Sequence, residues 1–227
     1  MIRAAWIAML AAIAVVVTGF ELDRQARFDD AFVRFVPAPF RTFALQRKVL
    51  AEVREDDADA ALADAISLVR RRPMPAQGLT LLAMARARQG EGAVARDTVL
   101  LAGTRGWRSL GAQVAVFGMA LDAGDHDAAA SRLAALWVLD PDRARPVSLT
   151  AQLIASPEGR MAFAQVLARG KRWPDGAIRA LHGHVPPGEL ADLVGQAIAA
   201  GALFDCGALA ASGYDAAGQR PVKCASD

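Results

Sequence analysis

Residues 90–95 read Gly-Glu-Gly-Ala-Val-Ala, and residues 124–129, one period of 34 residues later, read Gly-Asp-His-Asp-Ala-Ala. Each stretch places a glycine five residues before an alanine, and Ala61 lies one period further upstream. Glycine after a helix permits a left-handed cap, and alanine both favours helix and lets neighbouring helices approach closely. The spacing therefore predicts pairs of helices that turn at the glycines.

The residues that begin and end the expected helices in the rest of the chain predict an all-α fold. Acidic residues precede the expected helix 57–70, and Arg70–Arg72 followed by Pro73 end it, as the helix dipole favours; this arginine run is interpreted as a solvated helix end. Proline in the first turn suits the helices that begin after Ser156 and Pro186. The expected helices are 42–54, 57–70, 75–89, 93–103, 109–122, 126–139, 147–155, 157–169, 174–183 and 187–203, followed by an irregular tail, 205–227.

The stretch 42–141 resembles the tetratricopeptide repeat family, whose helix-turn-helix units have a 34-residue period. In that alignment Ala61, Ala95 and Ala129 take the small position where two helices cross, and Gly90 and Gly124 take the turn. Pro73 and Pro141 close their repeats, whereas Lys48, Trp107 and Phe117 depart from the pattern. The resemblance implies an α-solenoid of helical hairpins that binds proteins, with residues 142–204 as its capping helices.

Such an array has a concave groove lined by the first helix of each repeat. An extended peptide or a helix would suit its mixture of amide, basic and apolar groups. In the alternative, the later helices of the chain fill this groove. The residues predicted to contact a partner are Gln46, Arg54, Gln77, Thr80, Met84, Arg88 and Asp122.

The N-terminus carries an uncharged apolar run of 17 residues, Ala4 to Phe20. This length is at the short end of what a membrane-spanning helix needs. Residues 1–20 are therefore predicted to be a transmembrane signal anchor, with a cleaved signal peptide as the alternative. A single anchor ahead of a large domain predicts that the domain lies outside the cytoplasm. The layout also resembles bacterial proteins with one membrane helix and a few degenerate repeats, which implies the inner membrane and a periplasmic domain.

A juxtamembrane segment, 21–41, follows the anchor. Phe28, Phe32 and Phe35 have the spacing i, i+4, i+7 and are expected to share one helical face, until Pro37 interrupts the helix. That face would either contact a partner or the membrane surface, or pack against the first repeat. Near the other end of the chain, Cys206 and Cys224 are expected to form a disulfide if the domain is exported, and are otherwise free thiols.

No residue set specifies a reaction. His182 and His184 flank Gly183, but no further ligands at a readable spacing complete a metal site. We find no nucleophile elbow and no phosphate-binding loop, and the net charge of +2 does not call for nucleic acid. The sequence thus predicts no enzyme, cofactor or metal. It favours a membrane-anchored scaffold of a cell-envelope complex, or else an accessory subunit held by its transmembrane helix and phenylalanine-rich segment.

Overall fold

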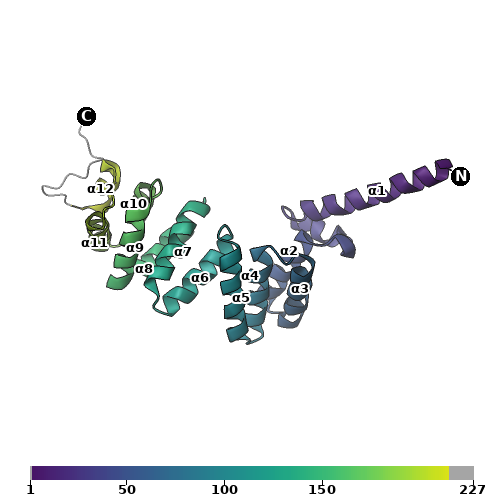
Figure 1. Ribbon diagram of the computed structural model, residues 1–227, viewed down its shortest axis with the longest axis horizontal. Coiled ribbons are helices and arrows are strands. Elements are labelled where there is room, and N and C mark those ends of the chain that lie inside the picture. The colour runs from purple at the N-terminus through teal and green to yellow at the C-terminus, as the bar shows by residue number, and fades with distance from the viewer. Residues whose placement is uncertain (1, 215–227) are drawn as a thin grey trace. The chain divides into compact units, whose positions relative to one another are not determined.

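The computed structural model of the chain describes residues 2–214, and every element in that range is a helix (Figure 1). The predicted all-α class with one apolar N-terminal helix is confirmed. Two 3-10 helices, η1 (Asp30–Phe35) and η2 (Ala38–Phe40), lie between α1 and α2. The α-helices are α1 (Ile2–Gln25), α2 (Phe43–Glu55), α3 (Ala58–Arg71), α4 (Ala76–Arg88), α5 (Gly92–Arg105), α6 (Leu110–Asp122), α7 (His126–Leu139), α8 (Ala144–Ile154), α9 (Pro157–Arg169), α10 (Pro174–Leu181), α11 (Pro187–Ala199) and α12 (Cys206–Ser212).

The chain forms two compact units, one up to Gly106 and one from Trp107 onward. In the first unit α2 packs on α3, α3 on α4 and α4 on α5, so successive helices stack in chain order as in a solenoid. In the second unit α6 pairs with α7, and α9 packs against α7, α8 and α11. The boundary between the units falls inside the stretch 42–141 that resembles repeats.

The turns between paired helices recur with the 34-residue period. Asp56, Gly90 and Gly124 have φ values of 63°, 80° and 71°, in the left-handed region that favours glycine. The residue that follows each of them is the N-cap of the next helix. The side chains of Asp57 and Asp125 each accept a hydrogen bond from the backbone N–H of the residue three positions later, at 3.2 and 3.0 Å. The predicted glycine turns are therefore confirmed, and Asp125 caps α7.

Replacing Gly90 by alanine is expected to lower the free energy of unfolding by about 1 kcal/mol, because a Cβ disfavours a positive φ. Gly92, in the first turn of α5, is the matched control and should tolerate alanine without loss. No heavy atom lies within 4 Å of a Cβ built at either position, so the pair isolates backbone conformation. Denaturant unfolding of both variants measures the difference, and equal stabilities would contradict the left-handed turn.

The three periodic alanines are buried at equivalent positions of α3, α5 and α7. Ala61, Ala95 and Ala129 are 0 %, 6 % and 0 % exposed. Each donates its backbone N–H to the residue four positions earlier, in the turn, so all three stand at the same register. A small side chain at this point lets two helix backbones approach closely.

Tryptophan at Ala95 or Ala129 is expected to destabilise the corresponding unit by about 1–3 kcal/mol, because the enlarged side chain overpacks a close helix crossing. Ala93→Trp is the control, since Ala93 is exposed on the same helix as Ala95. Thermal unfolding reports the change. Unchanged melting in both buried variants would rule out the close crossings.

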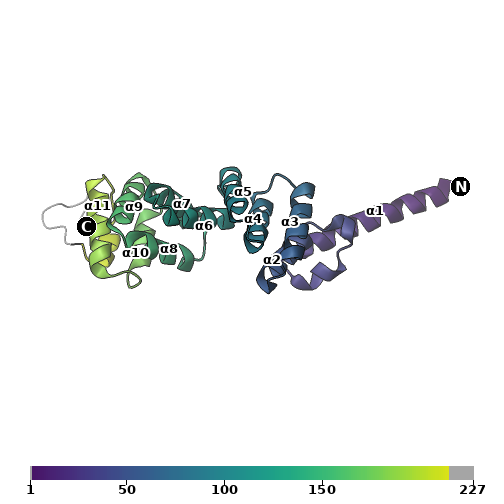
Figure 2. The ribbon, with the colours of Figure 1, turned by 90° about the horizontal axis from the view of Figure 1, so that it is seen from below.

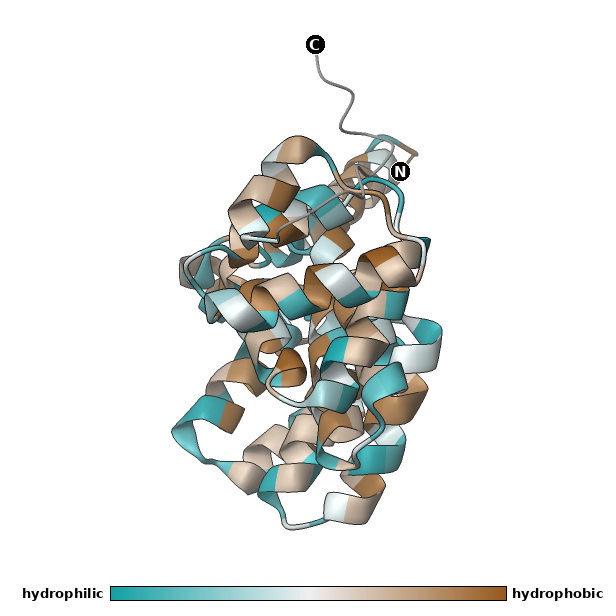
Figure 3. Ribbon diagram, turned by 90° about the vertical axis from the view of Figure 1, so that its left-hand side faces the viewer, coloured by the Kyte–Doolittle hydropathy of each residue, from teal (hydrophilic) through white to brown (hydrophobic). Residues whose placement is uncertain are grey.

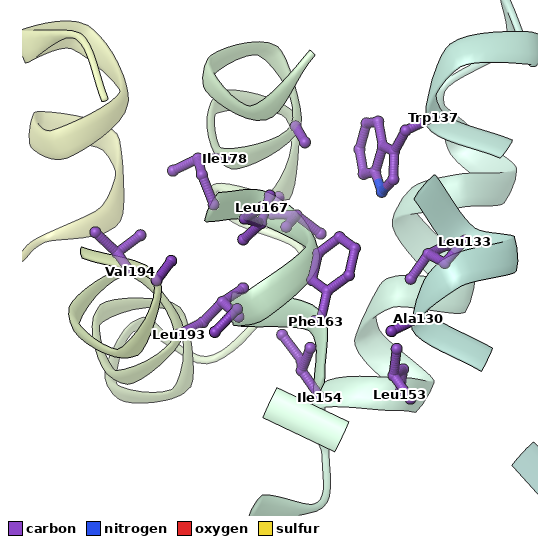
Figure 4. Close-up of a cluster of buried hydrophobic side chains, with 14 of the residues drawn as sticks. Ala130, Leu133, Trp137, Leu153, Ile154, Phe163, Leu167, Ile178, Leu193 and Val194 are labelled. Atoms are coloured by element: carbon purple, nitrogen blue, oxygen red, sulfur yellow. The ribbon is translucent and has the colours of Figure 1, made fainter. Parts of the chain in front are cut away.

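The core of the second unit includes Trp137 of α7, with Leu133 and Ala130 of the same helix (Figure 4). Its indole N–H donates to Thr150 Oγ1 at 3.0 Å, and its ring stacks on Trp173 with 6.4 Å between ring centroids. Phe163 of α9 lies 6.0 Å from the Trp173 ring. Hydrophobic and hydrophilic residues alternate along the helices of this unit (Figure 3), as expected of helices with one face toward a core and another toward solvent.

Several helix boundaries differ from the sequence prediction. Helix α8 begins at Ala144 rather than 147, because Pro146 in its first turn needs no N–H partner. Helix α11 ends at Ala199 rather than 203, and Gly201 follows with a φ of 97°. The tail predicted to be irregular contains α12, whose N-terminus is capped by Asp205.

The predicted disulfide lies partly outside the described residues. Cys206 is the first residue of α12, whereas Cys224 falls beyond residue 214. The pairing of the two cysteines therefore stays a prediction.

Candidate functional site

Helix α1 is the one helix among residues 2–214 that is long and apolar enough to cross a membrane. Its 24 residues correspond to about 36 Å, slightly more than the hydrocarbon core of a bilayer. All of residues 2–18 are exposed, so no described part of the chain covers this apolar surface. The helix continues to Gln25, five residues beyond the predicted end at 20.

The last turns of α1 are wrapped by residues 26–42, which we call the collar. Figures 1 and 2 both show this segment folding back beside the end of α1. Phe40 packs so closely on Gly19 that a Cβ there would lie 2.5 Å from its ring, and it meets Phe20 edge to face at 5.2 Å. Ala26 and Val36 are buried in a cluster with Ala44, and Phe40 and Leu22 pack against this cluster. The collar therefore forms a small core of its own with α1.

Asp23 of α1 caps the N-terminus of α2. Its carboxylate, 4 % exposed, accepts three backbone hydrogen bonds, from Thr42 at 2.8 Å, Phe43 at 3.1 Å and Ala44 at 3.0 Å. Thr42 stands at the N-cap position but makes no side-chain cap itself. A carboxylate at a helix N-terminus satisfies orphan N–H groups and complements the helix dipole. Asp23 thus fastens the apolar helix to the first helical pair.

Arginines of the first unit hold the collar from outside. Arg47 donates to the carbonyl of Arg27 at 2.9 Å, and Arg71 donates to the carbonyl of Ala38 at 2.9 Å. Arg72 lies over the Phe43 ring at 5.5 Å. Arg70, Arg71 and Arg72 are exposed, as predicted for a solvated helix end, and two of these side chains also contact the collar and the start of α2.

The sequence predicted that the three juxtamembrane phenylalanines share one α-helical face, and this prediction is wrong. Phe28 lies in the turn after α1, whereas Phe32 and Phe35 belong to η1. The 3-10 geometry has three residues per turn, so the i, i+4, i+7 pattern does not align there. Phe32 packs against the collar core, and Phe28 and Phe35 remain 72 % and 58 % exposed.

A hollow of about 250 Å³ brings predicted partner-binding residues from two helices together. Gln46 of α2 and Gln77 of α4 line it. Leu50 and Leu81 add apolar surface to the same wall. The remaining lining residues, which carry positive charge and aromatic surface beside the collar, are Arg27, Phe43 and Arg47. The hollow thus combines amide, apolar and guanidinium groups.

The other predicted partner-binding residues are distributed more widely. Arg54 lines a neighbouring hollow of about 330 Å³ that shares Arg47 and Leu50 with the first. Thr80 is buried and its hydroxyl donates to the carbonyl of Ala76 at 3.0 Å, so it faces no partner surface.

Met84 and Arg88 are exposed on α4, and Arg88 forms an ion pair with Asp56 at 2.7 Å. Asp122 ends α6 in the other unit. Binding of a partner by any of these residues stays a prediction.

Lys48 occupies an apolar position of the repeat pattern and bridges two helices. It contacts Asp64 of α3 and forms an ion pair with Glu52 of α2 at 2.9 Å. Asp64 and Glu52 raise the pKa of Lys48. Burial raises the pKa of Glu52 above its usual 4.5, against the opposing attraction of Lys48, and its Oε2 atom has no hydrogen-bond partner. The two carboxylates of Glu52 and Asp64 thus explain how Lys48 is accommodated beside the core.

Glu52→Gln is expected to flatten part of the pH dependence of stability. A raised pKa means that the folded state holds the proton more tightly, so Glu52 favours folding at low pH. This contribution is lost as the pH rises through the raised pKa, from about 4.5 upward. Unfolding of wild type and variant across this range measures it, and the remaining titrating groups are common to both. Parallel curves would contradict the raised pKa.

Sequence reasoning missed three residues of this region. Asp23 and Arg27 act on segments about twenty residues away, so no local pattern marks them. Phe43 begins α2, but two guanidinium groups, of Arg27 and Arg72, lie over its ring. The excess of arginine between residues 24 and 47 was the available signal, although it does not reveal which helix each side chain meets.

The second unit has a separate hollow of about 830 Å³, between α8 and α10. Its polar lining residues are Arg143, Ser148, Gln152 and His184, and Val147 and three alanines add apolar surface. His182 instead contacts the carbonyl of Ala211 at 2.6 Å. Within residues 2–214 no three side chains of the metal-binding types come together.

No family model, curated protein or solved structure matches this chain. The class that the fold itself defines is an all-α chain of stacked helical pairs behind one apolar helix.

Proposed function

We propose that the chain is a membrane-anchored scaffold or assembly subunit of a bacterial cell-envelope complex, with tetratricopeptide-like repeats that bind a protein partner. In this proposal α1 crosses the inner membrane and the helical units lie in the periplasm. The observation that carries it is the hollow of Gln46 and Gln77, which adjoins a collar fastened to α1 by Asp23. A binding surface held near a membrane anchor raises the effective concentration of membrane partners.

The chemistry of the hollow favours one kind of ligand. Leu50 and Leu81 offer apolar contact, Arg47 offers positive charge, and the glutamine amides can pair with a peptide backbone. We infer that the ligand is a peptide segment with an apolar side chain next to a carboxylate.

Filling the hollow tests the proposal. Gln77→Trp adds bulk at an exposed lining position and leaves the core untouched, whereas Asp97→Trp adds the same bulk on the exposed side of α5. After purification in mild detergent, a partner should co-elute with wild type and with the Asp97 variant but not with the Gln77 variant. A partner retained equally by both variants would exclude the hollow, and a partnerless wild type would overturn the scaffold.

The exposed surface of α1 favours a second candidate, an accessory subunit held mainly through its membrane helix. Ala4, Ala8, Ala11 and Ala12 would allow close packing against another helix in lipid. Exchanging residues 2–18 for an unrelated apolar helix separates the two candidates, and Gly19 is kept because Phe40 rests on it. The scaffold predicts that the partner is retained. Loss of the partner, with the chain still in the membrane, favours the second candidate.

A further inference from the structure

We infer that the collar is a second lipid contact, in which Arg27 and Arg34 bind the phosphate groups of anionic phospholipids while Phe28 and Phe35 enter the edge of the hydrocarbon. The inference rests on the membrane anchor of the proposed function and extends it from α1 to residues 26–42. The collar would then fix how deeply and at what angle the first helical unit leaves the membrane.

The packing of the collar determines its level along α1. Phe40 contacts Gly19 and Phe20, the last residues of the uncharged run, and Leu22 packs on the buried residues of the collar. Glu21 and Arg24 then introduce charge on the exposed side of the helix and pair with each other at 2.8 Å. A segment packed against this transition in polarity lies at the membrane–water interface if α1 spans the bilayer.

Three aromatic rings of this region are exposed to solvent in the isolated chain. Phe20, Phe28 and Phe35 are 61 %, 72 % and 58 % exposed, although the neighbouring Phe32 and Phe40 pack inward. Large apolar side chains gathered outside a folded core mark an interaction surface, and aromatic rings are favoured where hydrocarbon meets headgroups. Phe20 belongs to the apolar surface of α1 itself, and α1 packs against η1, which carries Phe35; we therefore expect the same lipid to cover these rings.

The charge of the collar selects the kind of lipid. The Arg27 guanidinium lies 5.5 Å from the Phe28 ring, and the Arg34 guanidinium lies 4.7 Å from the Phe35 ring. Among residues 2–214 neither arginine forms an ion pair, whereas Arg24 and Arg47 do. An aromatic ring beneath a guanidinium leaves its N–H groups available for phosphate, which they bind in bidentate fashion. Phe28 and Phe35 therefore each lie beside an arginine that can bind phosphate, and Arg27 also lies 5.5 Å from the Phe43 ring.

Photocrosslinking in vesicles tests this contact on the full chain. Benzoylphenylalanine replaces Phe28 or Phe35, and Leu100, an exposed apolar residue of α5, is the control position. The protein is reconstituted in phosphatidylcholine vesicles with and without phosphatidylglycerol, and phospholipid adducts are measured by mass spectrometry. We expect adducts at both collar positions but not at Leu100. Phosphatidylglycerol should increase them about fivefold or more, the effect of one arginine near an anionic surface.

A pair of charge variants separates the arginines from net charge. The double variant Arg27→Gln/Arg34→Gln should lose the increase caused by phosphatidylglycerol. The double variant Arg70→Gln/Arg96→Gln removes the same charge from exposed positions on α3 and α5 and should retain it. Equal effects of the two double variants would overturn the assignment of the phosphate to Arg27 and Arg34.

The remaining outcomes distinguish the lipid contact from the anchor. A chain that floats with the vesicles but gives no lipid adduct at either phenylalanine would overturn the collar contact and leave the membrane anchor intact. Adducts between two protein chains at these positions would overturn it in favour of a protein surface. A chain that does not float with the vesicles would overturn both the anchor and the collar contact.

Discussion

Gly159→Ala is expected to lower the free energy of unfolding of the second unit by about 3 kcal/mol or more. A Cβ at this position would lie 1.9 Å from the carbonyl oxygen of Leu153 and 2.9 Å from its carbonyl carbon. These are backbone atoms at the end of α8, so no side-chain rotation relieves the clash. The turn between α8 and α9 must open, although Ser156 and Arg160 hold it by hydrogen bonds of 3.0 and 2.6 Å.

Helix α10 provides the matched control. Helix α9 begins with Pro157-Glu158-Gly159 and helix α10 begins with Pro174-Asp175-Gly176. Both glycines are therefore the third residue of a helix that begins with proline. No heavy atom lies within 4 Å of a Cβ at Gly176. Gly176→Ala should therefore keep or slightly raise stability. Thermal unfolding, with hydrogen exchange of peptides from α8 and α9, measures both variants. Equal melting of the two would contradict the close approach of α8 to α9.

Asp23→Ala is the second large effect, expected to cost about 3 kcal/mol in the first unit. The change removes the acceptor of three backbone N–H groups at the start of α2 and leaves buried donors without partners. It also cuts the polar link between α1 and α2. Asp23→Asn keeps one acceptor oxygen, so its free energy of unfolding should lie between those of Asp23→Ala and wild type.

Asp29→Ala is the control for the loss of a capping carboxylate. Asp29 is exposed and accepts one hydrogen bond, from Ala31 at 2.8 Å, at the start of η1. Its loss should cost about 1 kcal/mol or less. Detergent-solubilised protein is compared by hydrogen exchange of α2 peptides and by limited trypsin cleavage at Arg27, Arg34 and Arg41. If Asp23→Ala leaves the hydrogen exchange of α2 and the trypsin cleavage of the collar unchanged, the collar is held without this carboxylate.

The repeating part of the fold could be predicted because its signals are local. Gly90 and Gly124 permit left-handed turns, Asp125 caps the next helix, and buried alanines follow at a constant offset. Each signal acts within one turn of helix, so the sequence around it is sufficient. Asp56 takes the same left-handed turn without being glycine, and only the period itself indicates that position.

The collar could not be predicted because its contacts join residues that are far apart in sequence. The N-terminus of α2 has no useful cap of its own, and the missing acceptor is supplied from α1. The phenylalanine spacing suggested an α-helix, whereas Asp29 caps a 3-10 helix that turns Phe32 inward and leaves Phe35 outside. Packing against Gly19 and Ala26 decides this conformation.

The C-terminal end differs for a similar reason. The stretch after Asp205 is rich in glycine and alanine and has no clear apolar period. Helix α12 forms there because Asp205 caps it, Arg179 of α10 binds Asp205 at 2.7 Å, and Leu209 is buried. Tertiary contacts thus supply what the local sequence lacks.

Site-specific photocrosslinking in living cells tests the scaffold most directly. A photoreactive residue is placed at Gln77 in the hollow, with Asp97 on α5 as the reference position, and crosslinked products are identified by mass spectrometry. We predict a single stoichiometric protein partner, captured from position 77 and absent from position 97. Capture of no protein from position 77, or of the same mixture from both positions, would contradict a partner-binding hollow.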